Sequence, residues 1–304
     1  MFSETNYLAD DRWTFFSVDV ELTSHCGQNC LFCPRESLSR PAGFMAVAFF
    51  AKLAPQLAEF GSRITFCGMG NPLLHADLAE FGALCSEYRL NYGLTIQAPA
   101  LTAANVDKIL QFRPAFIEVS LPTIDPALFA KIYPEQKLEN SMTGLHNLVS
   151  RRGSKRGISI NSVVVAADSI PVEKTLEFWQ NEGFNCRILP CHSRGGNLQR
   201  ADLLKSSARR VERCGLFATH SFITWDARLL ACCHDLSGAT EIADLSAIPI
   251  KEAAATKRQM LLNGLNFAIC NNCDEPAALR PIPSRNFPES AKAKSRFLKS
   301  HCTG

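Results

Sequence analysis

The sequence predicts an α/β fold built on parallel strands. Between residues 15 and 190, segments rich in β-branched and aromatic residues alternate with segments that are apolar at helical spacing. Such alternation implies parallel strands joined by right-handed helical crossovers. With 304 residues, of which 46% are hydrophobic and 20% charged, the chain can bury the core of one large domain with or without a smaller appendage.

Each expected element follows from its local pattern. The expected strands are short, β-branched or aromatic runs, and cover residues 15–22, 63–68, 92–97, 116–121, 158–165 and 184–189. The expected helices carry apolar residues at helical spacing, and cover residues 45–60, 78–89, 103–112, 140–151 and 172–181. Alternation alone does not distinguish an unclosed barrel from a doubly wound sheet. Both folds place functional sites at the carboxyl ends of the strands.

The alternation stops after Pro190, and this suggests three regions. We expect the barrel or sheet over residues 1–195 and a small module of short irregular elements over residues 196–276. Residues 277–304 are rich in proline, serine, lysine and arginine, and we expect a mobile basic tail there.

Composition also excludes some classes of function. The richest apolar run, near residues 46–50, is much shorter than the roughly 20 residues of a membrane span. A net charge of +3 gives no reason to expect a nucleic-acid partner. The polar, acidic beginning of the sequence shows no export signal, so we expect a cytoplasmic protein with no membrane partner.

The sequence contains 13 cysteines, which is unusual for a protein expected in a reducing compartment. Reduced cysteines in this number suggest thiolate ligands to a metal or an iron–sulfur cluster. Cys26, Cys30 and Cys33 form a Cys-x3-Cys-x2-Cys motif in the loop after the first strand. A [4Fe–4S] cluster normally takes four thiolates, so this motif leaves one iron open. A zinc site is the alternative, but it needs four ligands and only His25 lies nearby.

At these residues the chain resembles the radical S-adenosylmethionine (SAM) superfamily. The resemblance implies a partial (β/α)6 barrel in which Cys26, Cys30 and Cys33 hold a [4Fe–4S] cluster and SAM binds the fourth iron. It also implies that Phe32, the aromatic residue before the last cysteine, lies along the adenine of SAM.

Two further features match this superfamily. The turn after the second strand looks like the Gly-Gly-Glu-Pro turn that receives the ammonium group of SAM, and comprises Gly68, Met69, Gly70, Asn71 and Pro72. Asn71 replaces the usual glutamate, although a backbone role does not need that side chain. An ordinary strand-to-helix turn is the alternative, because such turns are rich in glycine and proline. Ser120 and Asn161, on the fourth and fifth strands, occupy positions at which members of the family often contact SAM. The alternative is that both are ordinary hydrogen-bonded residues at strand ends.

A second group of cysteines follows residue 200. It resembles the twitch module, a shortened SPASM domain, in which a cysteine, a hairpin, a second cysteine and a distant Cys-x2-Cys pair hold an auxiliary [4Fe–4S] cluster. The corresponding residues are Cys214, Cys232, Cys270 and Cys273. A glycine commonly lies five positions before the second cysteine, and Ala227 occupies that position relative to Cys232, which favours Cys232 over Cys233. A zinc site is the alternative, although zinc ribbons prefer two Cys-x2-Cys pairs.

The remaining cysteines have simpler interpretations. Cys67, Cys85, Cys186 and Cys302 are expected to be packing or surface thiols. Since only Cys302 follows the Cys-x2-Cys pair, a second auxiliary cluster is not expected.

The resemblance implies a reaction class. One electron from the first cluster cleaves SAM, and the resulting 5′-deoxyadenosyl radical removes a hydrogen atom from a C–H bond. A fully ligated auxiliary cluster near the pocket could then accept an electron, as in a twitch-bearing relative that oxidises an amino-cyclitol alcohol. We therefore expect oxidation of a small molecule or a peptide side chain, with flavodoxin or ferredoxin as the reductant.

Two other functions stay open. Related enzymes with auxiliary clusters crosslink, epimerise or form thioethers in ribosomally made peptides, often with an N-terminal leader-binding domain that we do not expect here because the first strand begins near Phe15. A protein of another class, a non-catalytic iron–sulfur electron-transfer protein, is the other alternative.

The residue that would act as acid or base in the reaction is unassigned. Arg187, His192 and Arg194 lie at or after the last barrel strand, but a solvated loop explains them equally well.

Overall fold

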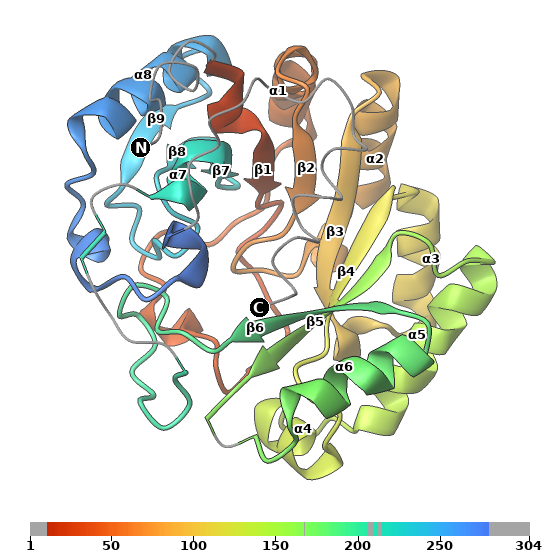
Figure 1. Cartoon of the computed structure of the whole chain (residues 1–304). Coiled ribbons are helices and arrows are strands. Elements are labelled where there is room, and N and C mark those ends of the chain that lie inside the picture. The colour runs from red at the N-terminus through yellow and green to blue at the C-terminus, as the bar shows by residue number, and fades with distance from the viewer. Residues whose placement is uncertain (1–10, 167, 206–209, 212–213, 280–304) are drawn as a thin grey trace.

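A computed structural model describes residues 11–166, 168–205, 210–211 and 214–279. In this part of the chain, nine strands form one sheet in the order β6-β5-β4-β3-β2-β1-β7-β8-β9 (Figure 1). The strands are β1 Ser17–Val20, β2 Arg63–Phe66, β3 Asn91–Gln97, β4 Phe116–Ser120, β5 Ile158–Val164, β6 Asn185–Pro190, β7 His220–Ile223, β8 Arg228–Leu230 and β9 Glu241–Asp244. Strands β1 to β6 pair in parallel in chain order, and β6 does not pair with β1, so the barrel is unclosed.

Helices connect the parallel strands and cover their outer face, as Figure 1 shows for α2, α3, α5 and α6. The α-helices are α1 Val47–Glu59, α2 Leu78–Glu87, α3 Ala103–Phe112, α4 Pro126–Ile132, α5 Leu138–Arg152, α6 Val172–Asn181, α7 Gly215–Thr219 and α8 Ile250–Asn263. The 3₁₀ helices are η1 Asp11–Phe15, η2 Arg35–Ser37, η3 Pro72–Leu74, η4 Ala98–Ala100, η5 Ala268–Asn272 and η6 Pro276–Leu279. None of the described helices is long and apolar enough to cross a bilayer.

The predicted α/β fold with an unclosed parallel sheet is confirmed. Each strand and helix predicted before residue 190 is present, with ends that differ from the prediction by no more than two residues. Helix α4 was not predicted. It begins where the Asp125 carboxylate accepts hydrogen bonds from the backbone N–H groups of Ala127 and Leu128, with Pro126 as the first helical residue. An Asp-Pro pair is a known helix-start signal and could have revealed it.

The two faces of the barrel sheet differ in chemistry. In β4, Ile117 and Val119 are fully buried against the helices. The alternating residue Glu118 contacts polar side chains of neighbouring strands, namely Arg63, Thr95 and Asn161. Because side chains alternate along a strand, one face makes the apolar core and the other lines a polar interior.

The second cysteine-rich segment extends the same sheet. Strand β7 pairs in parallel with β1, so that Ser17 lies opposite His220. Strands β7 and β8 form the hairpin that the resemblance to the twitch module implies between Cys214 and Cys232, and β9 pairs antiparallel with β8. Ala227, at the hairpin turn, has a φ of 72°, which is the left-handed conformation that glycine adopts most readily. The domain boundary near residue 195 stays a prediction, and residues 280–304 of the expected basic tail, including Cys302, lie outside the described residues.

The short helix η3 offers a matched test of the core. Leu73 is fully buried, whereas the neighbouring Leu74 is 44% exposed. Replacing Leu73 by alanine removes buried methyl groups and leaves a cavity, so we expect Leu73→Ala to lower the free energy of unfolding by about 2–5 kcal/mol. Leu74→Ala should change it by less than about 1 kcal/mol. Chemical denaturation under anaerobic conditions measures both, and equal losses would contradict this packing.

Candidate functional site

The first three cysteines lie in the loop that follows β1, at the carboxyl end of the barrel strands. The loop is tied down by a hydrogen bond from the Leu31 N–H to the Ile132 carbonyl (2.9 Å) and by a turn in which the Cys33 N–H bonds the Cys30 carbonyl (2.9 Å). The Gln97 amide, at the end of β3, donates to the Cys26 sulfur at 3.7 Å. All three thiols are partly buried. The loop therefore holds three sulfur ligands over the open end of the barrel.

Electrostatics show that these thiols influence one another. The pKa of Cys30 is raised to about 12, first by burial and then by Cys33 and Cys26. Burial also raises the pKa of Cys33, while Arg194 and Arg35 oppose that shift. With their pKa values raised in this way, the Cys30 and Cys33 thiols keep their protons near neutral pH in the free protein. A bound metal must displace their protons, and the three sulfurs would then supply three of four positions around it.

The turn over residues 68–72 packs tightly against the loop after β1. A Cβ atom at Gly70 would lie 2.1 Å from the Thr23 carbonyl oxygen, so only glycine fits. The Asn71 N–H donates to the His25 carbonyl at 2.8 Å. The Asn71 side chain is buried and accepts from the Leu73 N–H at 3.1 Å, which caps η3. The asparagine thus stabilises the turn itself, and the backbone of the turn lies beside the cysteine loop.

A buried ion pair anchors this arrangement. The Glu21 carboxylate follows β1 and accepts two hydrogen bonds from the Arg40 guanidinium, both at 2.6 Å. The same carboxylate accepts from the Met69 N–H at 2.9 Å. Both charged side chains are almost inaccessible to solvent. The Arg35 guanidinium donates to the Met69 carbonyl at 2.8 Å. Charge-assisted bonds therefore connect the cysteine loop to the turn after β2.

Ser120 and Asn161 lie opposite each other in the pairing of β4 with β5. The Asn161 amide donates to the Glu118 carboxylate at 3.3 Å, and its oxygen accepts from Arg187 at 3.2 Å. Burial alone would raise the pKa of Glu118, but Arg187 and Arg63 outweigh it and lower that pKa. Asn161 is thus already hydrogen-bonded, and Arg187 is held in the barrel interior by an ionised carboxylate.

Phe32 and Ser120, which are also expected near SAM, contact the core and Tyr133. Phe32 is partly buried and packs against the core beside its neighbouring cysteine. The Ser120 carbonyl accepts a hydrogen bond from the Tyr133 hydroxyl at 3.4 Å. Burial raises the pKa of Tyr133, and the three cysteine thiols raise it further. Tyr133 therefore lies between the cysteine loop and Ser120, a connection that its sequence position gave no reason to expect.

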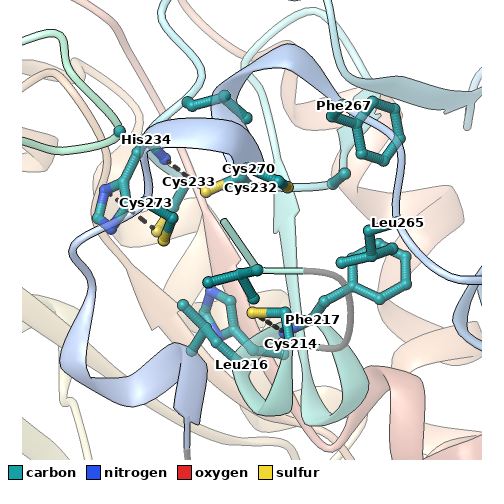
Figure 2. Close-up of a pocket in the computed structure, with 15 residues that line it drawn as sticks. Cys214, Leu216, Phe217, Cys232, Cys233, His234, Leu265, Phe267, Cys270 and Cys273 are labelled. Carbon is teal, nitrogen blue, oxygen red and sulfur yellow. Dashed lines mark hydrogen bonds between the residues drawn. The ribbon is translucent and has the colours of Figure 1, made fainter. Parts of the chain in front are cut away.

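The second cysteine group lines one cavity, which Figure 2 shows with the sulfur atoms around a shared space. The cavity has an empty volume of about 550 Å³, including its open mouth. Its cysteines are Cys214, Cys232, Cys233, Cys270 and Cys273. Much of the remaining wall is apolar, with Leu216, Phe217, Leu265 and Phe267 among its residues. Chain segments up to 59 residues apart, from Cys214 to Cys273, thus converge, as the resemblance to the twitch module implies.

Burial raises the pKa values of thiols that line this cavity. Burial raises the pKa of Cys214 to about 12, and burial also raises the pKa of Cys270. The Cys214 sulfur accepts the Phe217 N–H and the Cys232 sulfur accepts the His234 N–H, each at 3.4 Å. Backbone N–H groups that point at sulfur are the donors that tune iron–sulfur clusters. Cys233 contacts the His234 ring nitrogen at 3.8 Å.

His192, considered above only as a loop residue, belongs to a buried cluster beside this cavity that was not predicted. The Glu275 carboxylate contacts the Nε2 atoms of His192 and His234, at 3.1 and 3.0 Å. His234 follows Cys232 by two positions and Glu275 follows Cys273 by two, so proximity to the motif was the available signal. These contacts connect the loop after β6 to the second cysteine group.

Comparison with known proteins gives the following similarities. The family model described as "Radical SAM superfamily" matches residues 20–178. An S-adenosyl-L-methionine-dependent 2-deoxy-scyllo-inosamine dehydrogenase of Niallia circulans is 35% identical over 77 residues, covering 24% of this chain and 31% of that protein. A GTP 3′,8-cyclase of Mycobacterium ulcerans (strain Agy99) is 28% identical over 197 residues, covering 59% and 51%. The matches thus span about a third to a half of these curated relatives.

Solved structures share the fold. The crystal structure of BtrN in complex with AdoMet and 2-DOIA has a TM-score of 0.59 at 18% identity, covering 90% of this chain and 98% of that chain. Native anSMEcpe with bound AdoMet has a TM-score of 0.59 at 11% identity, covering 84% of this chain and 87% of that chain. Streptococcus suis SuiB bound to precursor peptide SuiA has a TM-score of 0.57 at 14% identity, covering 73% of this chain and 60% of that chain.

The tight contact at Gly70 can be tested directly. Gly70→Ala forces a methyl group into the Thr23 carbonyl, so we expect the free energy of unfolding to fall by about 1–3 kcal/mol. Gly27→Ala is the control, because a Cβ there meets nothing within 4 Å, and its effect should stay within about 0.5 kcal/mol. Denaturation of the metal-free protein measures both. A neutral Gly70→Ala would show that the turn does not dock as described.

Proposed function

The chain belongs to the radical SAM superfamily, and from this premise we propose that it oxidises a C–H bond of a small molecule or a peptide side chain with the help of an auxiliary iron–sulfur cluster. When bound, the first cluster and SAM supply a 5′-deoxyadenosyl radical, and the auxiliary cluster supplies an acceptor for one electron. The observation that carries this proposal is the presence of two separate thiol sets, one of three cysteines in the loop after β1 and one of five cysteines that line a cavity.

The first thiol set fits a cluster with one open position. Cys26, Cys30 and Cys33 lie on a loop fixed at the carboxyl end of the strands, and we propose that they hold the SAM-binding [4Fe–4S] cluster. We propose that the methionine part of SAM lies along the turn at residues 68–72, with Phe32 beside the adenine. Ser120 and Asn161 are proposed contacts deeper in the barrel. Arg35 already donates to the Met69 carbonyl, so that acceptor would be shared.

The second thiol set fits a cluster with four protein ligands. We propose Cys214, Cys232, Cys270 and Cys273 as these ligands. Cys232 is preferred to Cys233 because its sulfur accepts a backbone N–H, as the Cys214 sulfur also does. With all four positions taken by protein, such a cluster cannot bind substrate directly, so electron transfer is its proposed role.

Small-molecule oxidation is the preferred reaction. It is supported by sequence similarity to the inosamine dehydrogenase and by a structural match that covers 98% of BtrN. Modification of a peptide is the second candidate, supported by the fold shared with SuiB bound to a precursor peptide. A flavodoxin or ferredoxin is the proposed reductant. The non-catalytic alternative predicts no 5′-deoxyadenosine, and the first experiment below distinguishes it.

Loss of one ligand to the first cluster should abolish SAM cleavage. We expect Cys30→Ala to lower the rate of 5′-deoxyadenosine formation at least 100-fold, because the cluster that supplies the electron loses a ligand. The assay mixes anaerobically reconstituted protein, SAM and dithionite, with nucleoside detected by chromatography. Cys85→Ala, at a buried thiol of α2, is the control and should retain cleavage. Undiminished cleavage in Cys30→Ala would refute the assignment, and no cleavage in the wild type would favour the non-catalytic protein.

The auxiliary cluster can be tested by counting iron. The wild type should bind about eight iron atoms per chain, and Cys232→Ala should bind about four. Cys233→Ala should keep about eight if Cys232 is the ligand. The reverse result for this pair would assign Cys233, and about four iron atoms in the wild type would remove the auxiliary cluster from the proposal.

A further inference from the structure

Lys257 is a buried cation with an unusual set of partners. It lies on α8 and is completely inaccessible to solvent. Its ammonium group donates to the carbonyl oxygens of Thr14 (3.1 Å) and His220 (2.6 Å) and to the Ser221 hydroxyl (2.8 Å). All three acceptors are neutral. Within the described residues, no carboxylate is bonded to this ammonium group.

Such an arrangement is costly without a nearby negative charge. A lysine normally extends its charged end into solvent, and a buried charge without an ionic partner is strongly unfavourable. Helix α8 also has exposed positions, such as Lys251, that carry a lysine at no such cost. Burial lowers the pKa of Lys257 to about 7, and Cys214 opposes that shift. The thiols of the second set would supply this negative charge once they bind a metal as thiolates, and Cys214 is the member of that set that acts on Lys257.

Two contacts connect Lys257 to the cavity, one with the Phe217 ring and one from the Phe217 backbone to Cys214. Its ammonium group lies 4.8 Å from the centre of the Phe217 ring. The Phe217 N–H in turn donates to the Cys214 sulfur at 3.4 Å. Phe217 and Cys214 both line the cavity. Lys257 therefore packs against Phe217, a residue of the cavity wall whose backbone contacts the Cys214 sulfur.

We propose that Lys257 raises the reduction potential of the auxiliary cluster and so favours electron transfer from the substrate. This inference rests on the proposed auxiliary cluster. Taking up one electron would add one negative charge to a cluster already surrounded by thiolates, and the protonated form of Lys257 nearby would stabilise the more negative state. In the step affected, the substrate radical loses one electron to the cluster and one proton to water or a nearby base. Lys257 does not touch the substrate and acts only through its charge.

The test is the midpoint potential of each cluster, measured by EPR-monitored redox titration of the reconstituted protein. We expect Lys257→Met to shift the oxidised-to-reduced equilibrium of the auxiliary cluster at least tenfold toward the oxidised form, which is about 59 mV more negative. Iron content and the SAM-sensitive signal of the first cluster should not change. Lys251→Met, at an exposed position of the same helix, is the matched control and should leave both potentials unchanged.

Two further variants keep the test decisive if Lys257→Met does not fold. Lys257→Arg retains the charge and should keep the wild-type potential. Ser221→Asp retains Lys257 but places a carboxylate beside its ammonium group, and should produce the same negative shift as Lys257→Met. If the midpoint potential of the auxiliary cluster is unchanged in Lys257→Met or Ser221→Asp while the iron content is full, the inference about Lys257 is wrong and the proposed function is unaffected. A wild type without a second cluster overturns the proposed function instead.

Discussion

Strand β1 is the structural element on which both thiol sets depend. It lies between β2 on one side and β7 on the other, in parallel with both. Its carboxyl end leads into the loop of Cys26, Cys30 and Cys33, while β7 and β8 lead to Cys232. The two sulfur-lined regions therefore share one hydrogen-bonded framework. Their relative position is set by backbone pairing, which is more rigid than a linker between domains.

Ion pairs reinforce this framework in two places. At the end of β1, the Glu21 carboxylate joins Arg40 and the Met69 backbone. Deeper in the barrel, Glu118 is shared by Arg63 and Arg187. Breaking a buried pair such as Glu21–Arg40 typically costs about 3–5 kcal/mol, whereas the partly exposed Glu118 contacts contribute less, so the Glu21 pair is the main contact that favours a single arrangement of the loops. A barrel interior held by ionic contacts is also suited to polar ligands.

Local sequence patterns predicted the first half of the fold well, because each parallel strand and helix carries its own periodicity. They did not predict that β7 joins the barrel sheet, since a four-residue strand does not encode a partner about 200 residues earlier. Cys214 and Cys273, which the resemblance to a twitch module grouped together, line the same cavity, while their role as ligands stays a prediction. Lys257 could not be recognised, because a lysine on a helix usually indicates a solvated face, and only the packing of α8 buries it.

Continuity of the sheet across β1 and β7 has a consequence for engineering and for evolution. A cluster module attached by a linker could be exchanged between enzymes as a cassette. Here, cutting the chain near residue 195 and removing the later part would separate β7 from β1, and each of these two strands would then have one edge of unpaired backbone groups. Grafting this module onto another barrel would therefore require that the recipient's first strand match it in register, so the two parts are expected to be inherited together.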